Sequence, residues 1–252
     1  RLGYSEINGS VTTTTTVRNM YSYSRQANGV QNLFAFDNGT LSYYDGTNKN
    51  SVVSGLTSAA VPEFRVFVDQ LFMVGANSSN VYLTPANIAG TTYSTSTNLS
   101  GAPAGARFVE VFQNKLYFVD VSVGGTRYPS RWYRSSIPDT SGNITWTSTD
   151  YEEAYTDNGE GVKGVHTNKT LNQLLFFKET SLHAYDGFRL KDAGAVGTTA
   201  HRSIVTINYT TFFWNEKGMF AYSGSEPTLI SRPIQKWIDG ISDYTALFSA
   251  GF

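Results

Sequence analysis

The densest run of basic side chains in the sequence lies between Arg127 and Arg134, where it alternates with aromatic residues. Guanidinium groups bind phosphates and aromatic rings stack on nucleobases, so this pattern is typical of nucleic-acid or partner contacts. In an extended chain, however, Trp132 and Arg134 share one face. At least one arginine is therefore expected against a half-buried aromatic surface. Two hypotheses stay open for Arg127, Arg131 and Arg134: structural pairing within the fold, or contact with a partner or DNA.

The densest acidic run follows at Asp150, Glu152, Glu153, Asp157 and Glu160. Two carboxylates about 5 to 10 Å apart can hydrolyse a glycosidic bond, and several carboxylate oxygens can bind calcium. Neighbouring residues on a strand point to opposite faces, and the run lacks the spacing of a calcium loop. A solvated loop is therefore the favoured interpretation. If the protein bound or hydrolysed a glycan, Glu152, Glu153 and Asp157 would provide the polar contacts.

Other catalytic chemistries find little support in the sequence. There is no cysteine, which excludes disulfides, thiol nucleophiles and Cys-ligated metals. The three histidines, His166, His183 and His201, lie in different neighbourhoods, and none is near a nucleophile-elbow glycine pattern. Three widely spaced histidines also argue against a zinc site. The sequence thus predicts a protein that is not an enzyme and uses no cofactor or metal.

The composition narrows the class of protein further. The 252 residues include 19 basic and 20 acidic side chains, which argues against wrapping of nucleic acid by neutralising many phosphates. Charged residues make up 15% of the chain, against about 25% in ordinary domains. No apolar run reaches about 18 residues, so no membrane span is expected. Thr, Tyr, Phe and Val are abundant, and this composition favours an all-β protein.

A short pattern recurs five times along the chain: a polar residue, an apolar-aromatic strand that begins with Leu or Phe, and a turn. The first copy is the clearest, because Asn38-Gly39 supplies the positive φ angles of a tight hairpin. Five hairpin-centred units predict a β-propeller of about five or more blades, each a four-stranded sheet, forming one domain over residues 1–252. A β-sandwich or an irregular pair of β domains is the alternative. The strands begin at Leu33, Leu71, Leu116, Leu174 and Phe212.

Three segments between these strands carry separate expectations. One short helix is predicted near 232–241, with Ser231 as its N-cap, Pro233 in its first turn and apolar residues at helical spacing. The region from about 86 to 105 is expected to be a long connection between blades. The segment Ser136–Trp146 loosely resembles the Asp-box turn of sialidase-like propellers, although two of its gaps are one residue too long. That motif is a structural turn, so it bears on the fold and not on activity.

Five groups of short segments, spread over most of the chain, carry a resemblance to a known family. They are Arg1-Leu2-Gly3-Tyr4; Val111–Phe118; Arg131–Ser136 with Trp146; Gly164-Val165 with Leu174–Lys178 and Ser181; and Gly218–Tyr222 with Ile230-Ser231 and the Ile234–Ile241 helix. Their order is similar to that in the β-propeller proteins of tailed-phage tails, the hub or nozzle components also described as packaged-DNA stabilisation proteins. Members of that family continue beyond the helix, so we expect this chain to be a segment of a longer polypeptide.

The resemblance implies a non-enzymatic structural protein of the virion tail. Such a propeller would assemble with other copies of itself as a ring, contact adaptor or tail proteins, continue the DNA channel and help to retain packaged DNA. Its contact with double-stranded DNA would be transient, and no membrane would be involved. The alternative function is a glycan-binding or glycoside-hydrolysing propeller.

Overall fold

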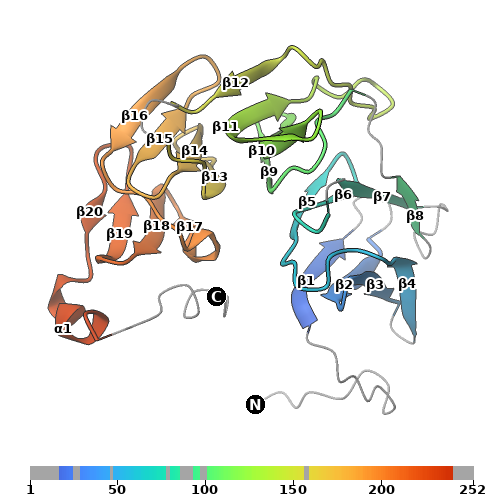
Figure 1. Cartoon of the computed structure of the whole chain (residues 1–252), viewed down its shortest axis with the longest axis horizontal. Helices are drawn as coiled ribbons and strands as arrows, with labels where there is room; N and C mark the ends of the chain where they lie inside the picture. Colours follow the sequence, from blue (N-terminus) through green and yellow to red (C-terminus); the bar gives the residue numbers. More distant parts are fainter. Residues whose placement is uncertain are drawn as a thin grey trace.

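The computed structural model describes residues 17–24, 29–45, 48–77, 80–85, 93–96, 101–155 and 159–240. These residues form five antiparallel sheets, each of four strands that are consecutive in the chain. The expected all-β fold is therefore confirmed. We number the sheets 1 to 5 in chain order. They follow one another along an arc, with sheet 1 and sheet 5 at its two ends (Figure 1).

The strands of each sheet are joined in simple up-and-down order. Sheet 1 contains β1 (Val17–Ser24), β2 (Gln31–Asp37), β3 (Thr40–Tyr44) and β4 (Lys49–Val53). Sheet 2 contains β5 (Glu63–Phe67), β6 (Gln70–Val74), β7 (Val81–Pro85) and β8 (Tyr93–Ser96). Sheet 3 contains β9 (Phe108–Phe112), β10 (Lys115–Val123), β11 (Thr126–Arg134) and β12 (Tyr151–Glu153).

The last two sheets repeat this arrangement. Sheet 4 contains β13 (Gly164–Asn168), β14 (Gln173–Phe177), β15 (Leu182–Tyr185) and β16 (Leu190–Gly194). Sheet 5 contains β17 (Val205–Ile207), β18 (Thr210–Asn215), β19 (Gly218–Tyr222) and β20 (Thr228–Leu229), and a 3-10 turn, η1 (His201–Ser203), precedes it. In Figure 1 the first strand of each sheet lies toward the middle of the arc and the fourth lies toward its outer rim.

All five hairpins expected from the repeated pattern are present, each formed by the second and third strands of a sheet. The first one shows why the sequence specifies it. Asn38 and Gly39 have φ angles of 41° and 74°, as the two-residue turn requires, and Asp37 pairs with Thr40 across it. The Asn-Gly pair therefore fixes the register of sheet 1.

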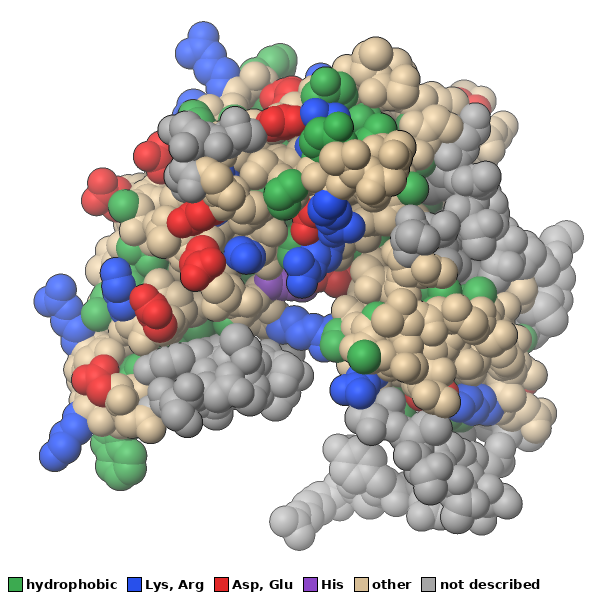
Figure 2. Space-filling view, viewed as in Figure 1, with side chains coloured by type: hydrophobic (Ala, Val, Ile, Leu, Met, Phe, Trp, Pro, Cys, Tyr) green, Lys and Arg blue, Asp and Glu red, His purple; other side chains and the backbone are tan. Residues whose placement is uncertain are grey.

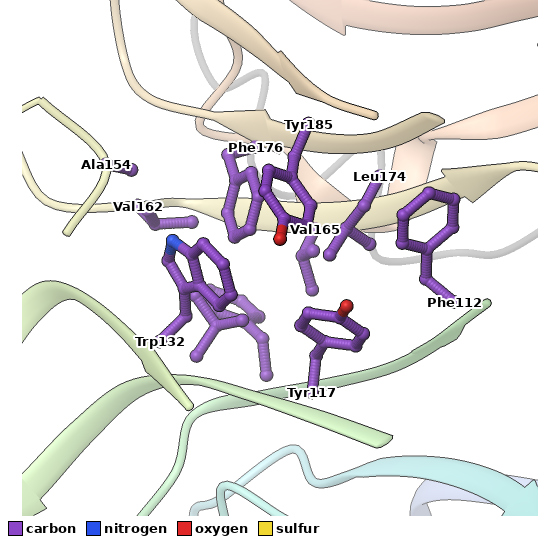
Figure 3. Packing of buried hydrophobic residues seen from close by; sticks show 11 residues of the cluster. Phe112, Tyr117, Trp132, Ala154, Val162, Val165, Leu174, Phe176 and Tyr185 are labelled. Carbon is purple, nitrogen blue, oxygen red and sulfur yellow. The ribbon is translucent and has the colours of Figure 1, made fainter. Parts of the chain in front are cut away.

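Apolar clusters fill the spaces between consecutive sheets. Between sheets 3 and 4, Trp132 and Tyr117 meet Phe176 and Tyr185 (Figure 3), and the rings of Trp132 and Tyr185 lie 4.9 Å apart. Burial of one such side chain contributes roughly 1.5 to 3 kcal/mol of stability. The packing of sheet on sheet is thus the main source of the fold's stability.

The second strands are apolar on both faces because an interior sheet has a neighbour on each side. In β14, Leu174 and Phe176 belong to the cluster shared with sheet 3, whereas Leu175 and Phe177 belong to the cluster shared with sheet 5. All four side chains are fully buried. The unbroken apolar run of this strand is explained by its position, since strands covered on both faces lose the usual alternation.

The predicted helix is present but shorter than expected. A 3-10 turn, η2 (Arg232–Ile234), leads into the single turn α1 (Gln235–Ile238), and Ile241 lies outside the described residues. Ser231 does not cap it; its Oγ instead accepts a hydrogen bond of 3.1 Å from the backbone N–H of Met219. Trp237 is 82% exposed while Ile238 is buried. The apolar residues at helical spacing therefore do not form a single buried face of the helix.

The expectation of a long connection over 86–105 was partly wrong, because β8 (Tyr93–Ser96) lies within it and completes sheet 2. This strand is short and rich in Ser and Thr, and it therefore lacks the apolar pattern by which strands are recognised. Backbone pairing to β7 forms it, with Pro85 opposite Tyr93.

The segment resembling an Asp-box turn forms a compact loop between β11 and β12. The carboxylate of Asp139 accepts hydrogen bonds of 2.8 and 2.9 Å from the backbone N–H groups of Ser141 and Asn143. These bonds lower the pKa of Asp139. Trp146 closes the loop, because its ring stacks on Phe118 at 4.7 Å. The polar side chain of Asp139 thus stabilises the conformation of this loop.

We expect Gly39→Ala to destabilise the protein more than Gly55→Ala. Both glycines have left-handed φ angles, of +74° and +78°, so each substitution carries a conformational cost of about 1 kcal/mol. At Gly39 the new Cβ would also collide with the carbonyl oxygen of Leu56, whereas nothing lies within 4 Å at Gly55. Urea unfolding of both variants measures the difference. Equal losses of stability would contradict this account of the turn.

Candidate functional site

The basic and acidic runs singled out in the sequence meet each other in sheet 3. Arg131 donates to Glu153, with its Nη2 2.6 Å from Oε1, across the β11–β12 pair. Its guanidinium carbon lies 3.8 Å from the ring centre of Tyr128 and 3.9 Å from that of Tyr151. A planar cation held between two rings and a carboxylate is largely desolvated.

Arg134 lies on the opposite face of β11 and is held by three groups. Its guanidinium donates to Asp150 at 3.0 Å, to Glu152 at 3.2 Å and to the hydroxyl of Tyr185 in sheet 4 at 2.9 Å. Desolvation by burial acts to lower its pKa, but these acidic partners outweigh it and the pKa is raised. Arg134 therefore ties the outer strands of sheet 3 to sheet 4.

Arg127 forms an ion pair with the buried carboxylate of Asp120 and donates to the carbonyl of Gly105 at 2.7 Å. All three arginines thus have the partners that the structural hypothesis requires, and their contact with a protein partner or DNA stays a prediction. Asp157 lies outside the described residues. Glu152 and Glu153, proposed for glycan contact, are held by Arg134 and Arg131.

A different group of polar residues surrounds two adjoining cavities near the middle of the arc. The larger encloses about 570 Å³ and the smaller about 350 Å³, and both are lined by Glu63, His201 and Arg202. These residues come from β5 and η1, which are far apart in sequence. Near the centre of Figure 2, Lys and Arg side chains and acidic side chains lie around a histidine. β5 is the first strand of sheet 2 and η1 leads into the first strand of sheet 5, and these first strands line the inner side of the arc (Figure 1).

Glu63 and His201 form a buried contact at the boundary of the two cavities, from the carboxyl oxygen to the ring Nε2. Burial raises the pKa of Glu63 and lowers the pKa of His201, because desolvation disfavours both charged forms. Nearby arginines reinforce the shift of His201. The pair can be a neutral carboxylic acid beside a neutral imidazole, or a carboxylate beside an imidazolium. Both forms hold the same number of protons. The pair therefore adds no net charge to the cavities at neutral pH.

Arg65 lines the smaller cavity and belongs to a second compensated pair. Arg65 binds Glu110 with two hydrogen bonds, of 3.1 and 2.9 Å, which join β5 to β9. His166 on β13 lies 3.0 Å from the hydroxyl of Thr206, and burial lowers its pKa. The histidines that look isolated in the sequence are therefore partly brought together, since His166 and His201 line the same cavity.

Three cations of the larger cavity lack close acidic partners. The nearest recorded carboxylate oxygens lie 3.8 Å from Arg107, on Asp120, and 3.9 Å from Lys163, on Glu179. No ion pair within 4 Å is recorded for Arg202 among the described residues, and burial lowers its pKa. This wall of the cavity can attract negatively charged groups. Within the described part of the chain, no cluster of His, Asp or Glu could hold a metal ion.

Sequence reasoning missed this site because its residues are spread over 140 positions, from Glu63 to Arg202. One signal was available: charged residues stand inside otherwise apolar first strands, as in Glu63-Phe64-Arg65 and around Glu110. A charge in a strand destined for burial needs a partner or a function. Which residue would be that partner could not be deduced from spacing.

Comparison with protein-family models and with curated protein sequences finds no match. Among solved structures, the chain is similar to the extracellular domain of BT4673 from B. thetaiotaomicron, with 12% identity and a TM-score of 0.45 over 88% of this chain. It spans about a third of that protein's length (34%). It is also similar to the AfRom2 CNH domain, with 8% identity and a TM-score of 0.47, over 84% of this chain and 74% of that one. Similarities at this level do not assign a function. Across the described residues, no helix is long and apolar enough to span a membrane.

We expect the Glu63–His201 pair to give the protein a pH-dependent stability. In the unfolded chain Glu63 loses its proton near pH 4.5 and His201 near pH 6.5, but the folded pair keeps one shared proton over a wider range. The folded state therefore binds more protons between pH 6.5 and about 8, the raised pKa of Glu63, and its stability should fall over that range by about 1.4 kcal/mol per pH unit. Below pH 4.5 the unfolded state binds more protons, so stability falls in that direction too.

Glu63→Gln tests this expectation, because it removes the acidic member and retains the shape. Denaturant unfolding of both proteins from pH 5 to 9 should show that the variant loses less stability above pH 6.5 than the parent does. Contributions of other groups cancel in this difference. Parallel stability curves for the two proteins would show that the pair does not share a proton as described.

Proposed function

We propose that this chain is a non-enzymatic structural protein of a tailed-phage virion, a β-propeller of the tail hub or nozzle that assembles as a ring around the DNA channel. The observation that carries the proposal is the succession of five consecutive four-stranded sheets along an arc, with the first strands innermost (Figure 1). That is the arrangement of strands in propeller blades. The segments resembling the tail propellers are compatible with it: Val111–Phe118 spans the β9–β10 hairpin and Gly218–Tyr222 is β19.

The role of a scaffold is also supported by the way in which charged groups are used. Arg65 and Arg134 join neighbouring sheets through Glu110 and Tyr185, so these polar side chains stiffen the arc. Several large apolar side chains remain exposed, among them Phe188 at 91% and Trp237 at 82%. Exposed aromatic residues of this kind suit contacts with further copies or with other tail proteins.

The glycan-directed alternative is less favoured. Glu152 and Glu153 would need free carboxylates to hold a sugar, yet each is engaged by an arginine of β11. Release of Glu153 would leave the buried guanidinium of Arg131 without its carboxylate, and release of Glu152 would remove one of the three partners of Arg134; both cost free energy. We therefore propose the virion role ahead of glycan binding.

Proteomic analysis of purified particles from a culture that encodes this chain tests the proposal. We expect its peptides in the particles at a fixed ratio to the other tail proteins, because a ring component is present in a set number of copies. Negative-stain images of the full-length protein should show closed rings or ring-forming propellers. Absence of the peptides from intact particles would overturn the proposal, and specific binding on a glycan array would favour the alternative instead.

A further inference from the structure

The larger central cavity combines three features that together indicate a ligand. Its volume of about 570 Å³ suits a small molecule. Three cationic side chains line it, Arg107, Lys163 and Arg202, and they come from three separate parts of the chain. Its one acidic side chain, Glu63, is in contact with His201 and acts on Arg202 only at longer range. The wall of this cavity thus carries a positive charge that the described residues do not balance closely.

The three cations are partnered less closely than the arginines that pair with carboxylates elsewhere, and the side chain of Arg107 is 63% exposed. Arg65 makes hydrogen bonds of 2.9 and 3.1 Å to a carboxylate, and Arg131 makes two, of 2.9 and 2.6 Å. Arg107 and Lys163, by contrast, lie 3.8 and 3.9 Å from the nearest recorded carboxylate oxygens, which are distances beyond a hydrogen bond. Both side chains are attracted to those carboxylates, and both still have N–H donors available for a ligand.

Arg202 is the most informative of the three. It is half-buried, and the recorded contact of its guanidinium is a hydrogen bond at the 3.5 Å limit to the carbonyl oxygen of Pro62. A guanidinium withdrawn from water normally has a closer partner, because desolvation of a charge is costly. An anion in the cavity would supply that partner.

We propose that the larger central cavity is a binding site for a small molecule that carries one or two phosphate groups, held by Arg107, Lys163 and Arg202. Guanidinium groups bind phosphate oxygens with paired hydrogen bonds, and an ammonium adds a compact charge. Three cations match the charge of a phosphate or pyrophosphate group better than that of one carboxylate. This site is additional to the proposed structural role and does not depend on it.

Calorimetric titration of the purified full-length protein with inorganic phosphate, pyrophosphate and citrate at low salt tests the proposal. We expect pyrophosphate to bind most tightly, to raise the melting temperature by mass action and to bind more weakly as salt is added. Citrate distinguishes phosphate recognition from attraction of any polyanion. Binding of citrate equal to that of pyrophosphate would overturn the assignment of the ligand class, and no binding of either would overturn the site.

Arg202→Gln and Arg107→Gln should each weaken pyrophosphate binding by roughly tenfold or more, since each removes charged hydrogen bonds. The matched control is Arg232→Gln, which replaces an exposed arginine of η2 that does not line the cavity and should bind as the parent does. Arg202→Lys retains the charge and should keep more affinity than Arg202→Gln, which separates a local contact from a general loss of folding.

Circular dichroism and melting temperatures of each variant establish that the fold is intact. Equal affinity in the parent, Arg202→Gln and Arg107→Gln would place any pyrophosphate elsewhere and overturn the proposal. An equal effect of Arg232→Gln would do the same, because it would show non-specific attraction. None of these measurements involves virus particles, so their failure is distinguishable from failure of the virion role.

Discussion

The fold depends on one constraint: the central strands of each interior sheet must be apolar on both faces. In β14, Leu174 and Phe176 pack toward sheet 3 and Leu175 and Phe177 pack toward sheet 5. A sheet built in this way cannot be stable alone, because either uncovered face would expose large aromatic side chains to water. Neighbouring sheets must therefore stack in succession. The order of the sheets along the arc follows from this packing.

The same packing determines what polar residues can do. Polar residues on the first strands lie toward the middle of the arc, where water is limited. A charged side chain there needs a partner of opposite charge or a hydrogen bond. Arg65 with Glu110, and Glu63 with His201, meet this need by joining elements that are far apart in the chain. The carboxylates paired with Arg131 and Arg134 are more accessible, with side chains 34 to 41% exposed against 9% for Glu110 and 11% for Glu63. Position relative to the arc thus separates core pairs from rim pairs.

Much of the fold could be predicted from the sequence because its hairpins are locally encoded. Asn38-Gly39 specifies a turn through its own backbone preferences, and strands such as Leu174–Phe177 are apolar enough to stand out. The strand β8 could not be found, because pairing to β7 and not its Ser and Thr side chains makes it a strand. The central site could not be found either. Its contacts join Glu63 to His201, and no local pattern encodes a contact across four sheets.

The arginines show why residue type alone does not identify a binding site. The run from Arg127 to Arg134 has the composition of a phosphate-binding segment. Its guanidinium groups nevertheless form ion pairs with carboxylates in or next to sheet 3, those of Asp120, Glu153 and Asp150. Arg202 stands in an unremarkable stretch of sequence, but folding places it in a cavity without a close carboxylate. Affinity for an anion depends on the charge that remains after internal pairing, since a paired guanidinium must first break its existing bonds. That remainder is a property of the folded arrangement and not of the local sequence.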